Sequence, residues 1–496
     1  MKKRFLSLLC VLLSLMMVLP SVNLIAYAKQ KPIPVIVIHG LGGSDLYQDK
    51  NDGNTKIAQF GLDVKAMAGN TDILEEAIKL FTDTQKPDYD RLFSALGEYF
   101  TGTKINYNAN GSPQGNSGVR NYWTDPLSNH KEYLTMRDFS IPVMARQISD
   151  IIGAKNVYAF NYDWRADMCE SADKLRSLVV NVKKRTKSKK VTIVALSLGG
   201  AVVSAYMDKY KNYKDVARYI LINPAYQGVD VARAFGMDLT FNKNNVIPYL
   251  KHMEQAYQAG EKETLFRAIT ALGDYRIGVG LDKINKDIMK NSARRKQFFL
   301  EVVKPWIGNI PTFYELIPYA QFDSTVKTLV NMGYLDKNTG LYKKIQNYHK
   351  VQGRFRKNLK AVKKAGAEVA IIANYGTKAL PFTSKLNNHS DLLIDTKYAS
   401  VGATVAQYGK KLKGKNAKGA NVSKDKIINA RTCALPNNTW FIKGIIHGLY
   451  KYNGEASKMI ARLATGKVKC NVKAYKKKYK KGQFLKADQA QNLKNS

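Results

Sequence analysis

Short apolar runs rich in valine and isoleucine alternate along the chain with longer stretches in which apolar residues recur every three or four positions. The short β-branched runs are typical of buried strands and the longer spacing is typical of helices. This pattern predicts strands at 34–39, 156–161, 190–196, 217–223, 367–374 and 440–443. It predicts helices at 139–153, 168–187, 198–212 and 454–465. Strands that alternate with helices indicate βαβ units, and therefore a mostly parallel sheet flanked by helices.

Three segments interrupt this alternation. Residues 44–135 have weak periodicity, residues 231–365 are mostly helix-like with many lysines and arginines, and residues 467–496 hold nine lysines between Lys467 and Lys486 without an acid. Long insertions in a regular core are the usual place for a lid or a substrate cap. The chain is therefore expected to divide into an α/β core (29–230 and 366–466, with an insertion at 44–135), a helical cap or lid (231–365) and a basic C-terminal tail (467–496).

The N-terminus has the three parts of a secretory signal peptide. Lys2, Lys3 and Arg4 precede an apolar run that extends to about residue 25, and Ala26-Tyr27-Ala28 forms a small-x-small cleavage site. We expect cleavage after Ala28, which places the protein outside the cell or at its surface; an uncleaved N-terminal anchor is the alternative.

Three cysteines follow the predicted cleavage site: Cys169, Cys433 and Cys470. They allow one disulfide at most, and the sequence does not say which pair would form it.

The charge of the chain is unusual for its otherwise ordinary globular composition. Of 496 residues, 79 are basic and 39 acidic, which gives a formal net charge of +40. Such a charge predicts attraction to an anionic membrane or wall polymer, for which the basic tail is one candidate contact. A solvated tail explains the same lysines. No nucleic-acid recognition module is visible, so we expect no nucleic-acid partner.

The strongest chemical signal is a serine at the junction of a predicted strand and a predicted helix. Ser197 follows the run Thr192-Ile-Val-Ala-Leu and precedes Leu198-Gly-Gly-Ala. A weakly nucleophilic hydroxyl becomes reactive when a sharp turn presents it to a base, and such a turn leaves room only for small neighbours. Ala195 and Gly199 satisfy that requirement at positions −2 and +2. The amide of Leu198, at the start of the helix, is then placed to stabilise an oxyanion.

A glycine-rich turn after the first strand supplies the expected second oxyanion amide. The residues are His39-Gly-Leu-Gly-Gly43, and we assign the amide of Leu41 to this role. A dinucleotide-binding loop would need glycine where the chain has Asp45, and the Gly-Lys-Ser/Thr of a phosphate-binding loop is absent. His39 is expected to be a structural residue beside the turn.

The catalytic base is found by elimination among six histidines. In hydrolases with this elbow the triad follows the order serine, acid, histidine. Two histidines precede the serine, two lie in the helical insertion and one lies beside the candidate acid: His39, His130, His252, His349 and His389. His447 remains, between the last predicted core strand and the last predicted helix. We therefore expect His447 to be the base.

The acid should lie after the strand at 367–374 and before His447. Three aspartates qualify: Asp391, Asp395 and Asp425. A carboxylate in the loop that holds the first two could orient the imidazole and stabilise its charged form. Asp391 is preferred and Asp395 stays open, whereas Asp425 lies in a lysine-rich stretch that favours a solvated ion pair.

With these motifs the chain resembles the lecithin–cholesterol acyltransferase family of α/β-hydrolases. The similar stretches are 35–44 with its Gly-rich turn, Tyr162-Asp-Trp-Arg165, 191–200 with the serine, 222–228, and the loop around Ser390-Asp391. The Tyr-Asp-Trp-Arg motif is the most specific of them. Two departures from the family pattern are Leu196 before the serine and the sequence Leu-Leu-Ile after Asp391. Arg165 is expected to pair with Asp163 as a buried structural element.

The resemblance implies a triad of Ser197, Asp391 and His447 with oxyanion amides from Leu41 and Leu198. It implies an exported serine acyl-ester hydrolase or O-acyltransferase that acts on lipid through an acyl-enzyme, with water as the default acceptor. We expect no cofactor and no metal, because His-Glu-x-x-His and paired Cys-x-x-Cys motifs are absent. The alternatives are a non-catalytic hydrolase fold that binds anionic surfaces, and a hydrolase of non-lipid acyl donors.

Overall fold

The computed structural model describes residues 31–496, except for 84, 121–122, 137–139, 212–213, 231, 233–238, 257–266, 268 and 380–386. The predicted signal peptide, 1–28, lies outside the described residues. Within the described part, no helix is both long enough and apolar enough to cross a membrane.

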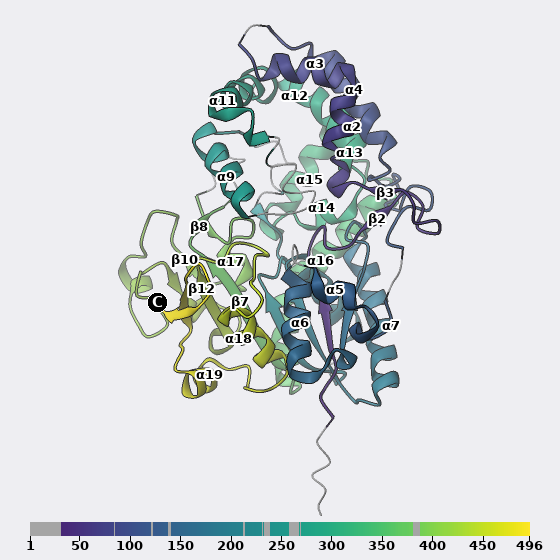
Figure 1. Cartoon of the computed structure of the whole chain (residues 1–496). Coiled ribbons are helices and arrows are strands. Elements are labelled where there is room, and N and C mark those ends of the chain that lie inside the picture. The colour runs from purple at the N-terminus through teal and green to yellow at the C-terminus, as the bar shows by residue number, and fades with distance from the viewer. Residues whose placement is uncertain are drawn as a thin grey trace, which may run out of the picture.

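An eight-stranded sheet forms the centre of the protein (Figure 1), with the strand order β14-β13-β12-β7-β6-β5-β1-β4. Every neighbouring pair is parallel except β13 and β14. The strands are β1 (Val35–Ile38), β4 (Val157–Phe160), β5 (Val191–Leu196), β6 (Val216–Ile222), β7 (Glu368–Tyr375), β12 (Thr439–Lys443), β13 (Phe484–Ala487) and β14 (Leu493–Asn495). The first six lie at the positions predicted from the apolar runs.

Helices cover both faces of this sheet, so its strands are apolar on both sides. Residues of one strand alternate between the two cores: Ile36 and Ile38 face one side, and Val35 and Val37 face the other. The first side is covered by α7 (Met168–Thr186), α8 (Leu198–Tyr210) and α16 (Gly340–Lys364). The second is covered by α6 (Ser140–Ile152), α18 (Glu455–Ala464) and α19 (Val472–Tyr479). A mostly parallel sheet with two helical layers and a strand–serine–helix turn after β5 is the α/β-hydrolase fold.

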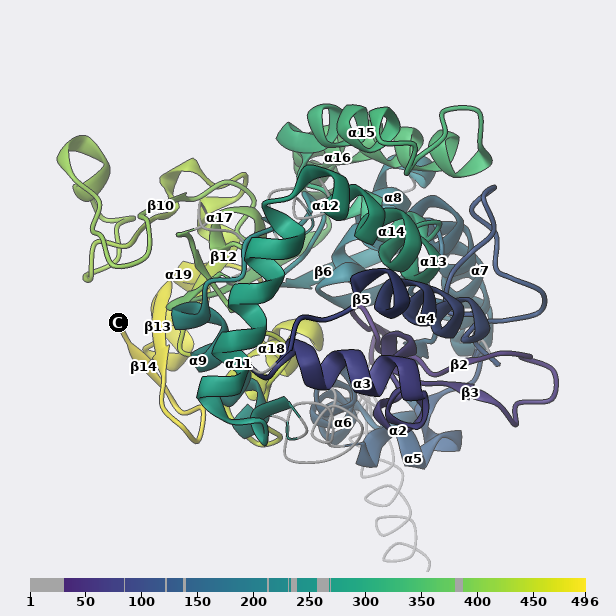
Figure 2. The same ribbon diagram turned by 90° about the horizontal axis from the view of Figure 1, so that it is seen from above.

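Both insertions contribute helices to one cap above the carboxyl ends of the strands (Figures 1 and 2). The first insertion provides α2 (Val64–Gly69), α3 (Thr71–Leu80) and α4 (Tyr89–Gly102), and the second provides α9 (Lys243–Ala256), α11 (Gly273–Lys283), α12 (Ser292–Phe298) and α13 (Lys304–Ile307). The two sets pack through aromatic rings. The ring centres of Phe93 and Phe298 are 5.4 Å apart, and the stacked rings of Phe100 and Trp306 have centres 4.9 Å apart. The cap expected from 231–365 is thus completed by residues from 44–135.

The end of the second insertion belongs to the core. It contains α14 (Pro311–Glu315), α15 (Phe322–Asn331) and then α16, which packs along α8. Ile345 and Phe355 of α16 are fully buried in the same core as α7 and α8, on the first side of the sheet. This long helix is the connection that lets β7 lie parallel to β6.

The basic C-terminal segment, 467–496, folds onto the sheet. Its helix α19 buries Tyr475, and β13 pairs with β12 at Phe441 and Phe484. Leu485 and Leu493 are also buried, whereas the lysines of α19 are exposed. The alternative of a solvated, unstructured tail therefore does not hold for this segment. Cys169, Cys433 and Cys470 are all free thiols.

Candidate active site

Ser197 lies on a sharp turn between β5 and α8, at the carboxyl end of a central strand. Its backbone adopts φ 55° and ψ −120°, a conformation that costs energy for any residue other than glycine. The turn is held by backbone bonds, because the Ser197 amide donates to the Ile222 carbonyl and the Ser197 carbonyl accepts from Gly200 and Ala225. The serine is 4 % exposed. The strained turn is the nucleophile elbow that the sequence predicts.

Close packing around the elbow explains why small residues surround the serine. A Cβ atom added to Gly199 would lie 2.9 Å from Ile38 Cγ2, and one added to Gly200 would lie 2.4 Å from Pro224 Cβ. A Cβ on Gly40, in the glycine-rich turn, would lie 2.9 Å from Ser197 Cβ. Side chains at these positions would therefore push the first strand, the elbow and the turn apart.

Two backbone amides next to Ser197 are available for an oxyanion. Leu198 opens α8, and Leu41 belongs to a turn closed by a hydrogen bond from Gly43 to the Gly40 carbonyl. Within the described part of the chain neither amide donates a hydrogen bond, and both residues line the same cavity as Ser197. This arrangement fits the role predicted for them.

His39 lies beside this turn as a buried, neutral residue. Its Nδ1 is 2.7 Å from the Gly40 carbonyl, its ring stacks 4.3 Å from Tyr162, and the Tyr162 amide donates to Nε2. Burial lowers the pKa of His39 to about 4. His39 thus stabilises the turn and has no free ring nitrogen for base catalysis.

Asp391 and His447, the predicted acid and base, are in direct contact. His447 Nδ1 lies 2.6 Å from Asp391 Oδ2, and the His447 amide donates to the Asp391 carbonyl at 2.8 Å. The other carboxylate oxygen accepts the amides of Leu393 and Ile394, so the acid is fixed at both oxygens. Asp391 is 1 % exposed. This geometry orients the imidazole and leaves its Nε2 for a second partner.

The three residues come from carboxyl ends of strands in one sheet. Ser197 follows β5, Asp391 lies in the loop after β7, and His447 follows β12. In the described part of the chain no hydrogen bond joins Ser197 Oγ to His447. Such bonds are often long without substrate and tighten in the complex.

The competing aspartates and histidines have other neighbours. Asp425 pairs with Lys443 at 2.9 Å, as expected for a partly exposed ion pair, and Asp395 is buried without touching a histidine. His130 stacks on Trp123, and His349 stacks 4.1 Å from Phe322. Tertiary contacts thus favour Asp391 over Asp395. The side chain of His252 lies outside the described residues.

An apolar cavity of about 490 Å³ extends from Ser197 into the cap. Ser197 is the one lining residue with a hydroxyl, and all the others are apolar or aromatic. They are Leu41, Phe60, Leu62, Leu198, Ala225, Val229, Ala232, Leu239, Phe241, Phe298, Phe299, Val303, Trp306, Ile307, Phe313, Leu316 and Leu393. Apolar residues of the second insertion therefore form much of the cavity wall, together with Phe60 and Leu62 of the first insertion.

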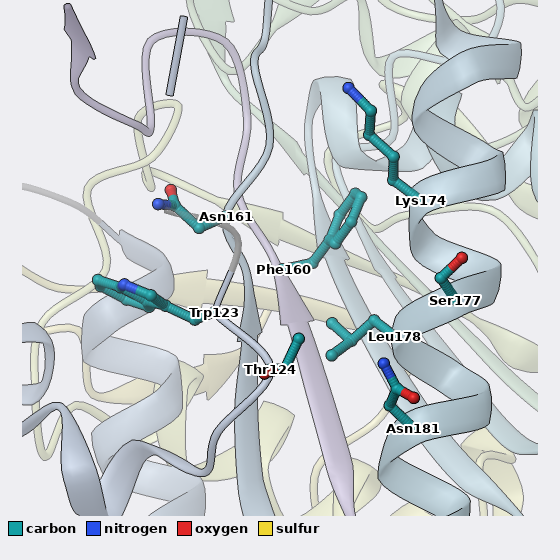
Figure 3. A pocket seen from close by; sticks show the side chains of 8 residues that line it. All are labelled: Trp123, Thr124, Phe160, Asn161, Lys174, Ser177, Leu178 and Asn181. Carbon is teal, nitrogen blue, oxygen red and sulfur yellow. The ribbon is translucent and has the colours of Figure 1, made fainter. Parts of the chain in front are cut away.

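A second, smaller cavity of about 160 Å³ lies by the edge strand β4 (Figure 3). Trp123 and Asn161 line one side, and Lys174, Ser177 and Asn181 line the other from successive turns of α7. It includes none of the predicted catalytic residues.

Arg165 connects the core to the first insertion. Its guanidinium donates to both carboxylate oxygens of Asp163, at 3.0 and 2.7 Å, and to the carbonyls of Lys104 and Ile105. The side chain is fully buried. These contacts agree with the structural role expected for this part of the Tyr-Asp-Trp-Arg motif.

Comparison with known proteins agrees with a lipase-like hydrolase. A sequence model of the family described as lipase (class 2) matches residues 150–215, which include β4, β5 and the elbow. No curated protein matches the sequence significantly.

Several solved structures are distantly similar. A chain of the Tle4–Tli4 complex has 12 % identity and a TM-score of 0.31, covering 88 % of this chain and 98 % of that one. A putative hydrolase from Bacillus subtilis has 13 % identity and a TM-score of 0.15 over 27 % and 47 %. An esterase from Thermogutta terrifontis has 16 % identity and a TM-score of 0.17 over 44 % and 85 %. The more specific resemblance to the lecithin–cholesterol acyltransferases rests on the motifs alone.

Proposed function

We propose that this protein is an exported serine hydrolase that cleaves the ester bonds of lipids. The observation that carries the proposal is the apolar cavity that begins at Ser197. A nucleophile at the end of a cavity of this size and polarity favours a substrate with a long hydrocarbon chain, because each buried methylene gains about 0.8 kcal/mol.

The chemistry follows from the contacts of the three residues. His447 Nε2 takes the proton of Ser197 Oγ as the oxygen attacks the ester carbonyl, and Asp391 stabilises the imidazolium through Nδ1. The amides of Leu41 and Leu198 stabilise the oxyanion. The imidazolium then protonates the leaving alcohol, and an acyl-enzyme remains. Water, activated by His447, attacks the acyl-enzyme and releases the fatty acid.

The identity of the acyl acceptor distinguishes the two activities: a hydrolase transfers the acyl group to water, and an O-acyltransferase transfers it to an alcohol. We propose water, because among the described residues that line the cavity Ser197 has the only polar side chain, which leaves none of them to hold an alcohol. Product analysis with a long-chain ester and a tenfold range of added alcohol tests this: free fatty acid is expected throughout. A new ester that rises with alcohol until it is the main product would assign acyl transfer instead.

Labelling with a fluorophosphonate probe tests the catalytic residues in the mature chain, 29–496. Wild type is expected to label, and Ser197→Ala is expected to lose labelling completely. His447→Ala and Asp391→Asn should slow it by a factor on the order of 10³ to 10⁴. Ser204→Ala is the matched control, since Ser204 is a buried serine two turns along α8. Labelling that survives Ser197→Ala would refute the assignment, and a folded wild type that never labels would favour a non-catalytic binding protein.

We also propose that the cationic C-terminal segment brings the enzyme to an anionic membrane. Lys473, Lys476 and Lys477 are exposed and share one face of α19, because they are spaced three and four residues apart. Each lysine near an anionic bilayer is worth about 1 kcal/mol. Since β13 and β14 belong to the sheet, charge replacement is a cleaner test than deletion of 467–496.

Vesicle sedimentation tests the membrane proposal. Replacing these three lysines by glutamine should weaken binding to phosphatidylglycerol vesicles roughly 100-fold at low salt, whereas arginine at the same positions should preserve binding. Equal binding of all three proteins would show that this face does not contact the membrane.

A further inference from the structure

Two buried carboxyl groups lie directly behind the candidate site and belong to segments that shape it. Asp395 follows the acid loop, 391–394, whose Leu393 lines the apolar cavity. Asp230 follows Val229, which lines the same cavity from the segment after β6. Asp395 is 2 % exposed and Asp230 is 4 % exposed. The pair therefore lies where the acid loop meets the cavity wall.

The contacts of Asp395 are unusual for a buried carboxylate. Neither of its carboxyl oxygens accepts a hydrogen bond within the described residues. Asp395 is the N-cap residue of α17 (Thr396–Ala399), yet its side chain makes no capping bond. An aspartate at this position ordinarily accepts a backbone amide of the first turn. Tyr398 connects it to Asp230: the Tyr398 amide donates to the Asp395 carbonyl at 2.9 Å, and the Tyr398 hydroxyl lies 3.4 Å from Asp230 Oδ1. The charge of Asp230 therefore acts on the Asp395 carboxyl group.

Asp230 is held in place by polar neighbours. Asn388 Nδ2 donates to its Oδ2 at 2.9 Å, and the Tyr398 hydroxyl lies 3.4 Å from its Oδ1. These donors stabilise a negative charge on Asp230. If the Asp395 carboxyl keeps its proton, its O–H donates a hydrogen bond to the Asp230 carboxylate. Each carboxyl group then has a partner, and the two share one proton.

Among the described residues of the surrounding segments, three other titratable groups have partners of their own. Asp391 is bound to His447, and the His389 ring packs against Tyr408. Lys397 Nζ lies over the ring of Tyr398, at 5.9 Å from its centre. Burial, and then the charge of Asp230, raise the pKa of Asp395 to about 7.

We propose that Asp395 and Asp230 share a proton and thereby position the acid loop, so that ionisation of the pair displaces Asp391 and lowers turnover at alkaline pH. Asp395 is in this sense a positioning residue that acts through Asp391. When the shared proton leaves to solvent, two like charges face each other in a buried site and repel. The repulsion separates the loop from the segment after β6. The amide bonds of Leu393 and Ile394 that orient Asp391 are on this loop.

The proposal rests on the proposed hydrolase function and predicts the shape of the pH profile of kcat. The falling limb belongs to the carboxyl pair, and kcat of wild type should fall at least about fivefold between pH 7 and pH 9. Asp395→Asn keeps the size of the side chain and provides a permanent donor to Asp230. Its kcat should stay level from pH 7 to pH 9, where that of wild type falls, with a KM that does not change over this range.

The matched control is Asp425→Asn, which makes the same exchange at an aspartate paired with Lys443 outside the pair. This control should keep the falling limb of wild type. If Asp395→Asn fails to fold, Asp230→Asn is the second variant. It also leaves one carboxyl group beside an amide that can donate to it, and it should also abolish the falling limb of the pH profile. A uniform loss of kcat at every pH in both variants, or a falling limb that persists in them, would overturn the proposal.

A readout that does not need turnover separates this proposal from the hydrolase function. The thermal midpoint of wild type should fall between pH 6 and pH 9 relative to that of Asp395→Asn, because the native pair holds a proton that the unfolded chain has released. Curves that stay parallel would refute the shared proton. If neither protein turns over any ester while the midpoints diverge, the proposed function fails and the carboxyl pair stands.

Discussion

The length of the apolar cavity should determine which length of acyl chain is preferred, and substitution of Trp306 tests this prediction. Trp306 lines the cavity from the cap, where its ring stacks on Phe100 and its indole N–H donates to the Phe60 carbonyl at 2.6 Å. Ser197 lines the same cavity from the core, after β5. We therefore expect Trp306 to form the wall that the end of an acyl chain meets.

The size of the effect follows from the area involved. A fully buried aromatic side chain of this kind covers about 200 Å², and Trp306 is partly buried. One methylene corresponds to roughly 30 Å² at 25 cal/mol per Å². If half of the indole faces the cavity, Trp306→Leu frees room for about three methylenes. Three methylenes at about 0.8 kcal/mol each raise kcat/KM for the longer ester about 50-fold relative to wild type.

The assay is a series of p-nitrophenyl esters from four to eighteen carbons, measured on wild type, Trp306→Leu and Trp306→Phe. The preferred length should move up by about three carbons in the leucine variant and stay in place in the phenylalanine variant, which keeps an aromatic wall. Short esters should be cleaved equally by all three. A fall in kcat/KM at every length, or a gain that includes the shortest ester, would refute the reasoning.

Three further predictions concern the stability of the fold. Arg165→Met should destabilise the protein by about 3–5 kcal/mol, because it leaves the carboxylate of Asp163 buried and unpaired. Adding Asp163→Asn to this variant should restore part of the lost stability, as measured by thermal unfolding. Burial, and then a neighbouring carboxyl, raise the pKa of Glu315 well above its usual range. The native state therefore keeps a proton that the unfolded chain loses above pH 4.5, so stability should decline as pH rises from there; Glu315→Gln should flatten that decline, and parallel melting curves would contradict it. Gly200→Ala should cost about 1–3 kcal/mol because its new methyl would meet Pro224, whereas alanine at the open position Gly102 should cost nothing measurable.

The strands and the elbow were predictable because their causes are local. Runs such as Val35–Ile38 and Val191–Leu196 are buried on both faces, so they are apolar except for Thr192 and stand out from their surroundings. The elbow requires small residues at fixed offsets from Ser197, and such a requirement is visible in the sequence. The same reasoning failed for β13 and β14, because lysines alternate with apolar residues in short strands at the edge of the sheet.

The sequence by itself determined the parallel α/β core and the serine at a strand–helix junction, since both depend on neighbours within a few positions. Only the tertiary structure shows which of two aspartates four residues apart in one loop contacts His447: it is Asp391 and not Asp395. One carboxylate turns to His447 and the other to Asp230, and both partners are distant in sequence. The joint cap and its cavity were likewise decided by packing between two insertions, because contacts between distant side chains leave no periodic signal in either segment.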